Sequence, residues 1–484
     1  MEQSKQKFLK NLVGFSMATW ISFLLGFISS PISTRLFQPE ELAKVTLFSN
    51  YANLFCSVSY LGLDQAFVRF YRETPGRMTR RSLFTFCAGV ALCFCLLASA
   101  VMAFFWRGVS REIVGQPDGT VFACLCLFTL FSVAYRFFSL SYRMEQSALR
   151  YTVQGVAHVL ITKIAYLAAG FRSPWGRSAI LLMTALMAAF TLISLVIHRK
   201  RFDPRFWQTT DKPALQALGA YALPLVPLNL FSWFGSTVNT LALKHLLGYA
   251  SAGIYASAMG LASTINIVQT GFNAYWAPYV LENYQSDDSR RFYTVHRMMA
   301  CLLTLFGLGI TLLQAPVFLL LGKSYRGSMV FFPFLFLSPI CYCLGETTGM
   351  GIDISKKTYW TTIIYLFSAA SNVALCYLLI PVLGMPGAAM ASAGSAIFTL
   401  LLRTRVGERY YRVLQSYRYL ACVIGLMLAA SVANLLLTGA VKYLALLALL
   451  ALACVLYRGE VKTLLDVTLG LCRAGRAKLR GKDD

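Results

Sequence analysis

Long apolar runs follow one another along almost the whole chain. Each run holds about 20 residues, which is enough for an α-helix to cross a hydrocarbon core of about 30 Å. We expect about fourteen such spans, near 11–34, 42–63, 82–105, 119–141, 152–170, 178–198, 216–242, 250–280, 297–321, 328–353, 358–382, 386–402, 419–438 and 443–457. Only short polar segments separate them, so the pattern predicts an all-α protein that crosses a membrane many times.

The composition agrees with this pattern. The 484 residues are 57% hydrophobic and 13% charged, whereas soluble domains are about 25% charged. The net charge of +24 would suggest a nucleic-acid partner in a soluble protein. Here the charges cluster in the short segments between apolar runs, so we expect no nucleic acid and a membrane-lipid environment instead.

The positive charges are unevenly divided between the two sides of the membrane. Counted on alternate sides of the spans, 32 Lys and Arg fall on the side of both termini and 10 on the other. Because Lys and Arg collect in cytoplasmic segments, we expect both termini in the cytoplasm of a bacterial cytoplasmic membrane. The longest outer segment is near Trp106–Asp118, and an enzyme acting on outer sugars would need a larger one. A transporter is therefore favoured over an enzyme.

The cysteines suggest no cofactor or metal. The 13 Cys lie almost entirely inside apolar runs and the chain has only 4 His, so we interpret the cysteines as small apolar core residues.

Several spans carry a stripe of polar residues on one helical face. In the second span Thr46, Asn50, Asn53, Ser57, Tyr60 and Asp64 follow steps of three and four, which place them on one side. Similar stripes run through the fifth span (Gln154, His158, Thr162, Tyr166), the seventh (Asn229, Ser232, Ser236, Asn239) and the eighth (Asn266, Gln269, Asn273). Such stripes serve interhelical hydrogen bonds or line a water-filled cavity. Four of them favour the cavity.

Some spans also contain charged residues. Lys163 lies midway along the fifth span, where a cation is costly and usually faces the interior of the helix bundle. Arg136 lies nearer the cytoplasmic end of the fourth span, where its side chain can also extend to the surface. Arg35 and Lys244 end the first and seventh spans on the outer side. These cations favour an anionic substrate group.

Acidic residues within spans are candidates for coupling to protons or sodium ions. Three lie in suitable positions, namely Glu346 and Asp353 in the tenth span and Asp64 at the end of the second. Asp64 and Asp353 are close enough to the cytoplasmic edge to be solvated instead.

Short motifs resemble those of a known family. Ser30–Glu41 is similar to the end of the first helix and first loop of bacterial polysaccharide flippases, and Gly62–Tyr71 to the end of their second helix. Gly248–Tyr255 and Ala274–Pro278 resemble the beginning and end of their eighth helix. Later matches are Lys356–Thr358, Asn372, Leu379–Pro381 and Gly384–Ala389. The chain thus resembles the Wzx-type flippases of the multidrug/oligosaccharidyl-lipid/polysaccharide exporter superfamily over most of 30–400.

The resemblance implies two six-helix lobes around a central cavity and two additional C-terminal helices. The expected parts are a cytoplasmic tail at 1–10, lobes at 11–198 and 216–402, a linker at 199–215, a cytoplasmic loop at 403–418, two extra helices at 419–457 and a basic tail at 458–484. The first two spans share their layout with the seventh and eighth, as repeated lobes would.

The resemblance also implies a flippase that moves undecaprenyl-pyrophosphate-linked oligosaccharide from the inner to the outer leaflet by alternating access, with other polysaccharide-assembly proteins as partners. We expect its cavity to be lined by Lys163, Arg136, Arg35, His158, Asn50, Asn53, Asn229, Ser232, Ser236 and Asn239. Many relatives carry an Asp-Arg pair in the seventh helix where this chain has Asn239-Thr240, so a charged contact from that helix is in doubt. Alternatives within the same fold are a flippase for lipid-II-type precursors and a multidrug antiporter. Alternatives outside it are a membrane polymerase or glycosyltransferase and a scaffold in an assembly complex.

Overall fold

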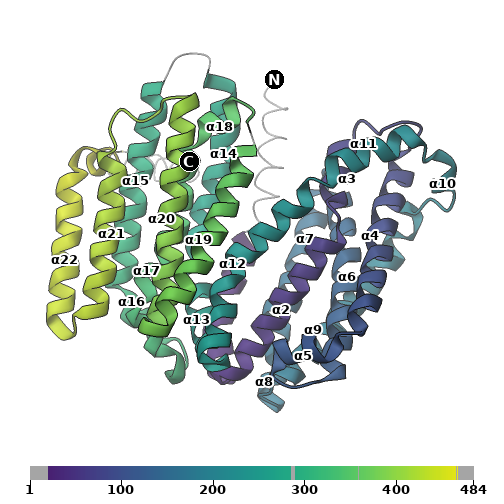
Figure 1. Ribbon diagram of the computed structural model, residues 1–484, viewed down its shortest axis with the longest axis horizontal. Helices are drawn as coiled ribbons and strands as arrows, with labels where there is room; N and C mark the ends of the chain where they lie inside the picture. The colour runs from purple at the N-terminus through teal and green to yellow at the C-terminus, as the bar shows by residue number, and fades with distance from the viewer. Residues whose placement is uncertain (1–19, 285–288, 358, 465, 467–484) are drawn as a thin grey trace, which may run out of the picture. The chain divides into compact units, whose positions relative to one another are not determined.

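The computed structural model describes residues 20–284, 289–357, 359–464 and 466, and every regular element among them is a helix (Figure 1). The expected tail at 1–10, the beginning of the first span and most of the expected basic tail at 458–484 lie outside the described residues. The all-α prediction is confirmed.

The chain divides into two compact units. Unit 1 contains the chain up to Ile267 together with Leu321–Tyr325, and unit 2 contains Val268–Leu320 and the chain from Arg326 onward. Unit 1 thus includes the helices of the predicted seventh span and the beginning of the eighth. The division into compact units does not test which helices move together. The lobes at 11–198 and 216–402 therefore stay a prediction.

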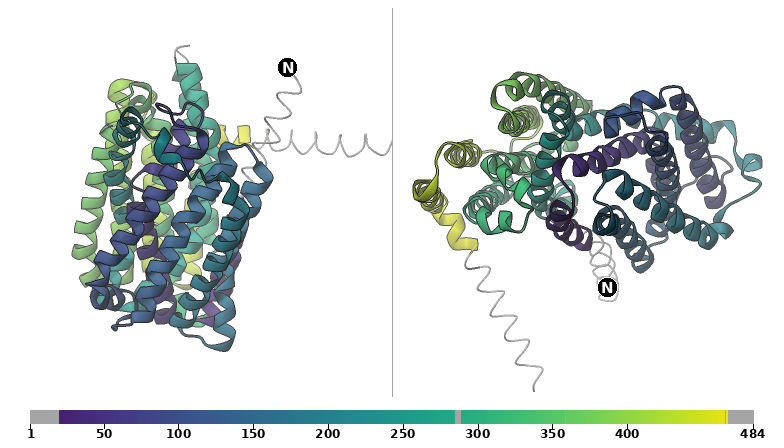
Figure 2. Two further views of the ribbon diagram at one scale, coloured as in Figure 1. Left: turned by 90° about the vertical axis from the view of Figure 1, so that its right-hand side faces the viewer. Right: turned by 90° about the horizontal axis from the view of Figure 1, so that it is seen from below.

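The helices of unit 1 run side by side and are joined by short turns (Figures 1 and 2). They are a first helix at 20–36, α2 (Pro39–Ser59), α3 (Leu63–Phe70), α4 (Arg80–Ala103), α5 (Trp106–Val114), α6 (Gly119–Met144), α7 (Ala148–Val159), the π-helical η1 (Leu160–Ala165), α8 (Leu167–Arg172), α9 (Gly176–His198), η2 (Arg199–Arg201), α10 (Phe206–Thr209), α11 (Lys212–Ala222), α12 (Leu225–Leu247), α13 (Tyr249–Ala262) and η3 (Ser263–Ile265). Helix α2 packs against α6, α9, α12 and α13.

Unit 2 begins within α14 (Asn266–Asn283), which starts in unit 1. Its other helices are α15 (Ser289–Leu312), α16 (Gln314–Leu319), most of the 3₁₀-helical η5 (Lys323–Val330), α17 (Phe332–Thr348), α18 (Met350–Ile354), α19 (Tyr359–Leu383), α20 (Met385–Tyr410), α21 (Arg418–Leu436) and α22 (Gly439–Leu456). Helices α21 and α22 pack on each other and on α15 at one edge of the unit (Figure 1).

Ten described helical segments are long and apolar enough to cross a membrane, or eleven if the bent pair η5 and α17 counts as one span. They coincide with eleven of the fourteen predicted spans. The first predicted span is only partly described, α2 is made less apolar by Glu40, Glu41 and its polar stripe, and α13 is only 14 residues long. The described helices therefore support ten or eleven of the fourteen predicted spans.

Local sequence signals explain where several helices begin. Thr79 and Ser82 form a reciprocal capping box at the start of α4, which satisfies two backbone N–H groups that a helix leaves without partners. The side chains of Asp118 and Asp211 accept hydrogen bonds from the first-turn N–H groups of α6 and α11. Helix α2 begins with Pro39, whose fixed φ suits the first turn.

A glycine allows α13 to approach α2 closely. A Cβ atom at Gly253 would overlap the backbone carbonyl of Pro39. Small residues permit this kind of close backbone packing between membrane helices. The contact fixes the position of α13 beside the beginning of α2.

Segments predicted to lie on the same side of the membrane meet at the same end of unit 1. Among the predicted outer segments, Arg177 pairs with Asp118 at 3.1 Å, and the Gly176 amide donates to Glu41 at 2.6 Å. Among the predicted inner segments, Arg201 pairs with Glu145 at 2.6 Å, and the Arg77 amide donates to Asp211 at 3.2 Å. The predicted alternation of sides therefore agrees with the contacts of this unit.

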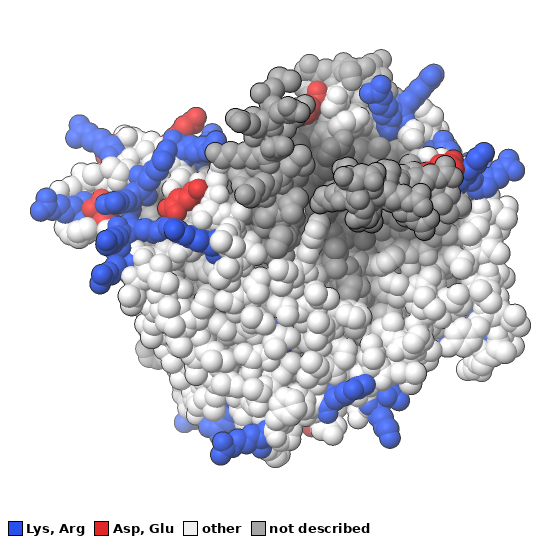
Figure 3. Space-filling view, turned by 180° about the vertical axis from the view of Figure 1, so that it is seen from behind, with Lys and Arg blue, Asp and Glu red and all other residues white. Residues whose placement is uncertain are grey.

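Charged side chains are sorted along each unit. On the face shown in Figure 3, Lys and Arg side chains gather toward the upper and lower edges of the view, and uncharged side chains fill the band between them. This is the distribution that a membrane-spanning protein requires, since charge within the hydrocarbon is costly.

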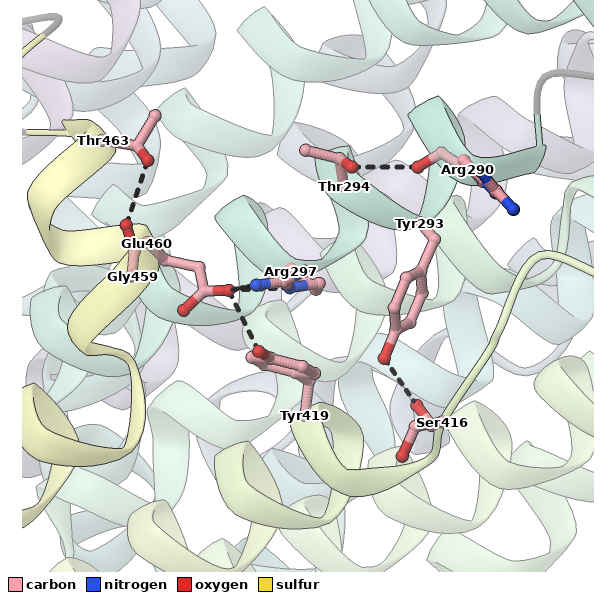
Figure 4. Close-up of polar contacts among 9 residues, drawn as sticks. All are labelled: Arg290, Tyr293, Thr294, Arg297, Ser416, Tyr419, Gly459, Glu460 and Thr463. Carbon is pink, nitrogen blue, oxygen red and sulfur yellow. Dashed lines mark hydrogen bonds and ion pairs between the residues drawn. The ribbon is translucent and has the colours of Figure 1, made fainter.

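A polar cluster joins three segments of unit 2 (Figure 4). The Arg297 guanidinium on α15 donates to one carboxylate oxygen of Glu460, with an Nε–Oε1 distance of 2.7 Å, and the Tyr419 hydroxyl donates to the same oxygen at 3.0 Å. Glu460 lies in the helical turn after α22 and is only 4% exposed. We call these three residues the Glu460 cluster. It fastens the segment that follows α22 to α15 and α21.

Candidate substrate site

A cavity of about 340 Å³ lies within unit 1. Its walls come from the first helix, the beginning of α2, the fifth-span segment around η1, and α13 with η3. The lining includes Lys163 and seven hydroxyl groups from Ser22, Ser29, Ser30, Ser33, Thr46, Ser257 and Ser263. One cation and several hydroxyl groups around one space can bind phosphate oxygens through charge-assisted hydrogen bonds.

Lys163 occupies an unusual backbone segment. The helix changes from α to π geometry at Leu160–Ala165 and returns to α geometry at Leu167. Single π turns inside α-helices are rare and are frequent at functional sites. Lys163 is exposed to the cavity. Among the residues that the structure describes, no acidic side chain forms an ion pair with its ammonium group.

The carbonyl of Lys163 has a partner from another helix. The Ser29 hydroxyl on the first helix donates a hydrogen bond to it. Both Ser29 and the neighbouring Tyr166 are buried, at 5% and 6% exposure. The Tyr166 ring also packs against Phe37, with ring centroids 6.0 Å apart. The segment that carries Lys163 is thereby attached to the first helix.

Arg136 is already paired. Its guanidinium lies 3.0 Å from the Asp64 carboxylate, which also accepts a hydrogen bond from the Gln65 side chain at 3.0 Å. The Asp64 side chain is 5% exposed and that of Arg136 is 38% exposed. Arg136 and Asp64 thus neutralise each other. Anion binding by Arg136 and ion coupling by Asp64 stay predictions.

The other predicted residues near the fifth span have different surroundings. His158 stacks on Tyr135 with ring centroids 4.3 Å apart and planes 3° from parallel, next to the cavity but not in its lining. Arg35 is exposed at the end of the first helix. Lys244 pairs with Glu112 on α5, so it is an unsuitable substitute for a free charge in the seventh span.

The stripes of α2 and α12 face each other in part. The Trp233 indole on α12 donates to the Asn50 carbonyl at 2.8 Å, and Asn53, Ser232 and Ser236 are exposed beside this contact while Asn229 is half-buried. Asn239 is buried. Most of the predicted cavity residues on α2 and α12 therefore lie at accessible positions in unit 1. They are not in the lining of the Lys163 cavity.

Two of the three acidic candidates for ion coupling lie in unit 2, and they differ in exposure and in ion pairing. Glu346 on α17 pairs with Arg403 on α20 at 2.7 Å, and both side chains are largely buried. Asp353 on α18 is exposed. No group of three or more His, Cys, Asp or Glu among the described residues could hold a metal ion.

Sequence reasoning missed the partners of the charged residues and the serines of the first helix. The serines carry a recognisable signal, since Ser22, Ser29 and Ser33 with Gly26 recur at intervals of three and four and so share one helical face. The partners Arg403 and Glu112 carry none, because they lie 57 and 132 residues from the groups they neutralise.

The comparisons with known proteins give the family. The family model described as polysaccharide biosynthesis protein matches residues 8–284, more than half of the chain. The chain belongs to this family. A comparison with curated protein sequences gives no significant match.

Solved structures show the same fold. The chain is similar to the lipid II flippase MurJ in an inward closed conformation, with a TM-score of 0.61 at 14% identity over 93% of this chain and 99% of that one. It is also similar to an inward-facing multidrug resistance MATE family transporter, with a TM-score of 0.59 at 14% identity over 81% and 97%. A third is the Vibrio cholerae MATE transporter VcmN, with a TM-score of 0.52 at 13% identity over 85% and 97%.

This member of the polysaccharide biosynthesis family is thus a multi-pass membrane protein of the MATE and MurJ fold. The family resemblance seen in the sequence motifs is confirmed.

Proposed function

We propose that this protein is a flippase that moves undecaprenyl-pyrophosphate-linked oligosaccharide from the inner to the outer leaflet of the bacterial cytoplasmic membrane. The observation that carries the proposal is the Lys163 ammonium group, which faces a hydroxyl-lined cavity and forms no ion pair among the described residues. A cation within a membrane span is costly, and a pyrophosphate would supply the compensating charge.

The sugar part would bind less specifically. Serine and threonine hydroxyls of the cavity and the exposed amide and hydroxyl groups of α2 and α12 can exchange hydrogen bonds with sugar hydroxyls. The lipid tail would stay in the bilayer while the head crosses. Rocking of two six-helix lobes around the head would expose it to one side at a time, as in other transporters built from repeats.

Fourteen spans with both termini in the cytoplasm belong to this proposal. The contacts of unit 1 support α2 as a span, because Glu41 at its beginning meets the predicted outer segment at Gly176 whereas Asp64, just after its end, meets Arg136 near the predicted inner end. A polar span of this kind needs neighbouring helices to cover it. The packing of α6, α9, α12 and α13 around it provides that cover.

The proposed test is a deletion strain complemented with wild type, Lys163→Ala, Lys163→Arg or Lys442→Ala. We expect the deletion to trap lipid-linked oligosaccharide on the cytoplasmic leaflet and wild type to restore surface polysaccharide. A hydrogen bond to a charged group contributes about 1.5–3 kcal/mol, so Lys163→Ala should reduce flux roughly 10- to 150-fold, whereas Lys163→Arg should retain part of it. Leaflet distribution and surface polysaccharide are the measurements.

Lys442→Ala is the matched control. Lys442 is likewise a cation on an apolar helix, but it is buried and its ammonium lies over the Tyr443 ring in α22 and not in the cavity. Its loss should leave flux unchanged. Full rescue by Lys163→Ala would remove the cationic site from the proposal. Normal leaflet distribution and surface polysaccharide in the deletion strain would exclude the glycan substrate and direct the test to lipid-II-type precursors and drug efflux.

A further inference from the structure

The wide turn that carries Lys163 is held between two anchors. On its N-terminal side His158 is stacked on Tyr135 of α6, and on its C-terminal side Tyr166 is buried against Phe37. A π turn contains one more residue than an α-helical turn. If the turn returned to α geometry, one anchor would rotate by about 100° relative to the other, the angle of one residue in an α-helix. Lys163 lies between the anchors and would turn with whichever side moved.

A hydrogen bond from a different helix stabilises the turn in its wide form. The α-helical ladder is interrupted at η1, and a carbonyl at such an interruption is available to a side-chain donor. The buried Ser29 hydroxyl of the first helix donates to the carbonyl of Lys163. The Ser29 and Ser33 hydroxyls both interact with the Tyr166 hydroxyl, so the bond to the Lys163 carbonyl is what sets Ser29 apart.

The neighbouring serine has a different role. Ser33 lines the same cavity, but its hydroxyl donates at 2.9 Å to the Ser30 carbonyl of its own helix. It therefore contributes polarity to the cavity without bonding to the backbone of the turn. The pair Ser29 and Ser33 separates the effect of holding the turn from the effect of a hydroxyl in the cavity.

We propose that Ser29 is a positioning residue that presents the Lys163 ammonium to the cavity by holding the π turn open. The presentation of the charge then depends on the packing of the first helix against the fifth span. Movement of the first helix away from this span breaks the hydrogen bond, lets the turn return to α geometry and withdraws the cation from a bound anion. The purpose of this positioning rests on the proposed function, but its geometry can be tested without any substrate.

The first experiment measures the accessibility of position 163 directly. In full-length protein in detergent, Lys163→Cys is labelled with a water-soluble thiol reagent, and labelling is quantified by mass spectrometry on the peptide that contains residue 163, so that native cysteines do not interfere. Adding Ser29→Ala should lower the labelling rate about fivefold, the effect of one net hydrogen bond. Adding Ser29→Thr, which keeps a hydroxyl, should restore much of the rate, and Ser33→Ala should leave it unchanged. An equal rate with and without the Ser29 hydroxyl would overturn the proposal.

The second experiment is a double-mutant cycle in anion binding. Farnesyl pyrophosphate serves as the probe, and its binding is measured for wild type, Ser29→Ala, Lys163→Ala and the double variant. If Ser29 acts through Lys163, the double variant should bind no more weakly than Lys163→Ala. Additive losses would instead assign Ser29 a separate structural role and overturn the positioning role. If Lys163→Ala binds the probe as tightly as wild type does, the result counts against the proposed function. The labelling experiment would still decide the role of Ser29.

Discussion

At the scale of single residues, the charges inside the helices differ in whether they have partners. Arg136 and Asp64 neutralise each other, Lys244 pairs with Glu112, and Arg403 pairs with Glu346. Lys163 forms no such pair among the described residues. In the proposed flippase, a charge without an ion-pair partner among the described residues is the one available to an anionic substrate, and this difference singles out Lys163.

The Asp64–Arg136 pair leads to a stability prediction. Removing one partner of a fully buried ion pair costs about 3–5 kcal/mol, and the cost is smaller here because only Asp64 is buried while the Arg136 side chain is 38% exposed. Arg136→Ala should therefore lower the thermal unfolding temperature in detergent clearly, and Asp64→Asn in the same chain should recover much of the loss. The exposed pair of Arg69 and Glu73, 3.9 Å apart, is the control, because Arg69→Ala should change stability by less than about 1 kcal/mol. A destabilised double variant, no better than Arg136→Ala, would mean that packing of the arginine matters more than its charge.

The residue types in the spans were sufficient to find Lys163, Arg136, Asp64 and Glu346 as unusual positions. Their partners could not be predicted, because ion pairing depends on which helices become neighbours in the fold. Of the two predicted cations, Arg136 is paired with Asp64, whereas Lys163 has no ion-pair partner in the part of the chain that the structure describes. No local pattern in the sequence contains this distinction.

At the scale of elements, the π turn shows that the spacing of residues along the chain does not predict every feature of the backbone. In a regular α-helix the steps of four and three would place Val159, Lys163 and Tyr166 on one face, and all three line the cavity with the turn widened. The sequence thus predicted that Lys163 would face the interior without predicting the backbone that presents it. The spans themselves were easier to predict, since a run of about 20 apolar residues reflects the thickness of the membrane directly.

The Glu460 cluster leads to a prediction for the segment after α22. Glu460→Gln removes the charge that Arg297 and Tyr419 bind, so the helical turn at 458–464 should detach more often from α15. Because Arg458 and Lys462 in this turn are exposed, limited digestion with trypsin should cut there several-fold faster. Thr463→Ala is the control, since the Thr463 hydroxyl bonds only to the Gly459 carbonyl within the same turn, at 3.0 Å. Equal cleavage of both variants would show that the cluster does not hold the segment.

At the scale of the whole molecule, the uneven distribution of Lys and Arg predicts its orientation. Counted on the predicted sides of the spans, 32 of these residues fall on one side and 10 on the other. Fusions of green fluorescent protein to the segment near 203–211 and to the C-terminus should therefore be fluorescent, and fusions of alkaline phosphatase at these positions should be inactive. Fusions near 115–117 should give the opposite result. Active phosphatase at both 115–117 and 203–211 would contradict the alternation that the contacts of unit 1 support.

The packing of α2 has a consequence for the synthesis of the protein. Helix α2 is the most polar of the long helices in unit 1, and part of its cover comes from α13, against which it packs at Gly253. About 190 residues separate the end of α2 at Ser59 from the beginning of α13 at Tyr249, and at about 5–20 residues per second their synthesis takes roughly 10–40 s. During this interval the nascent chain holds a half-covered polar helix beside the insertion machinery. The polar face of α2 therefore gains its full cover only after α13 has been synthesised.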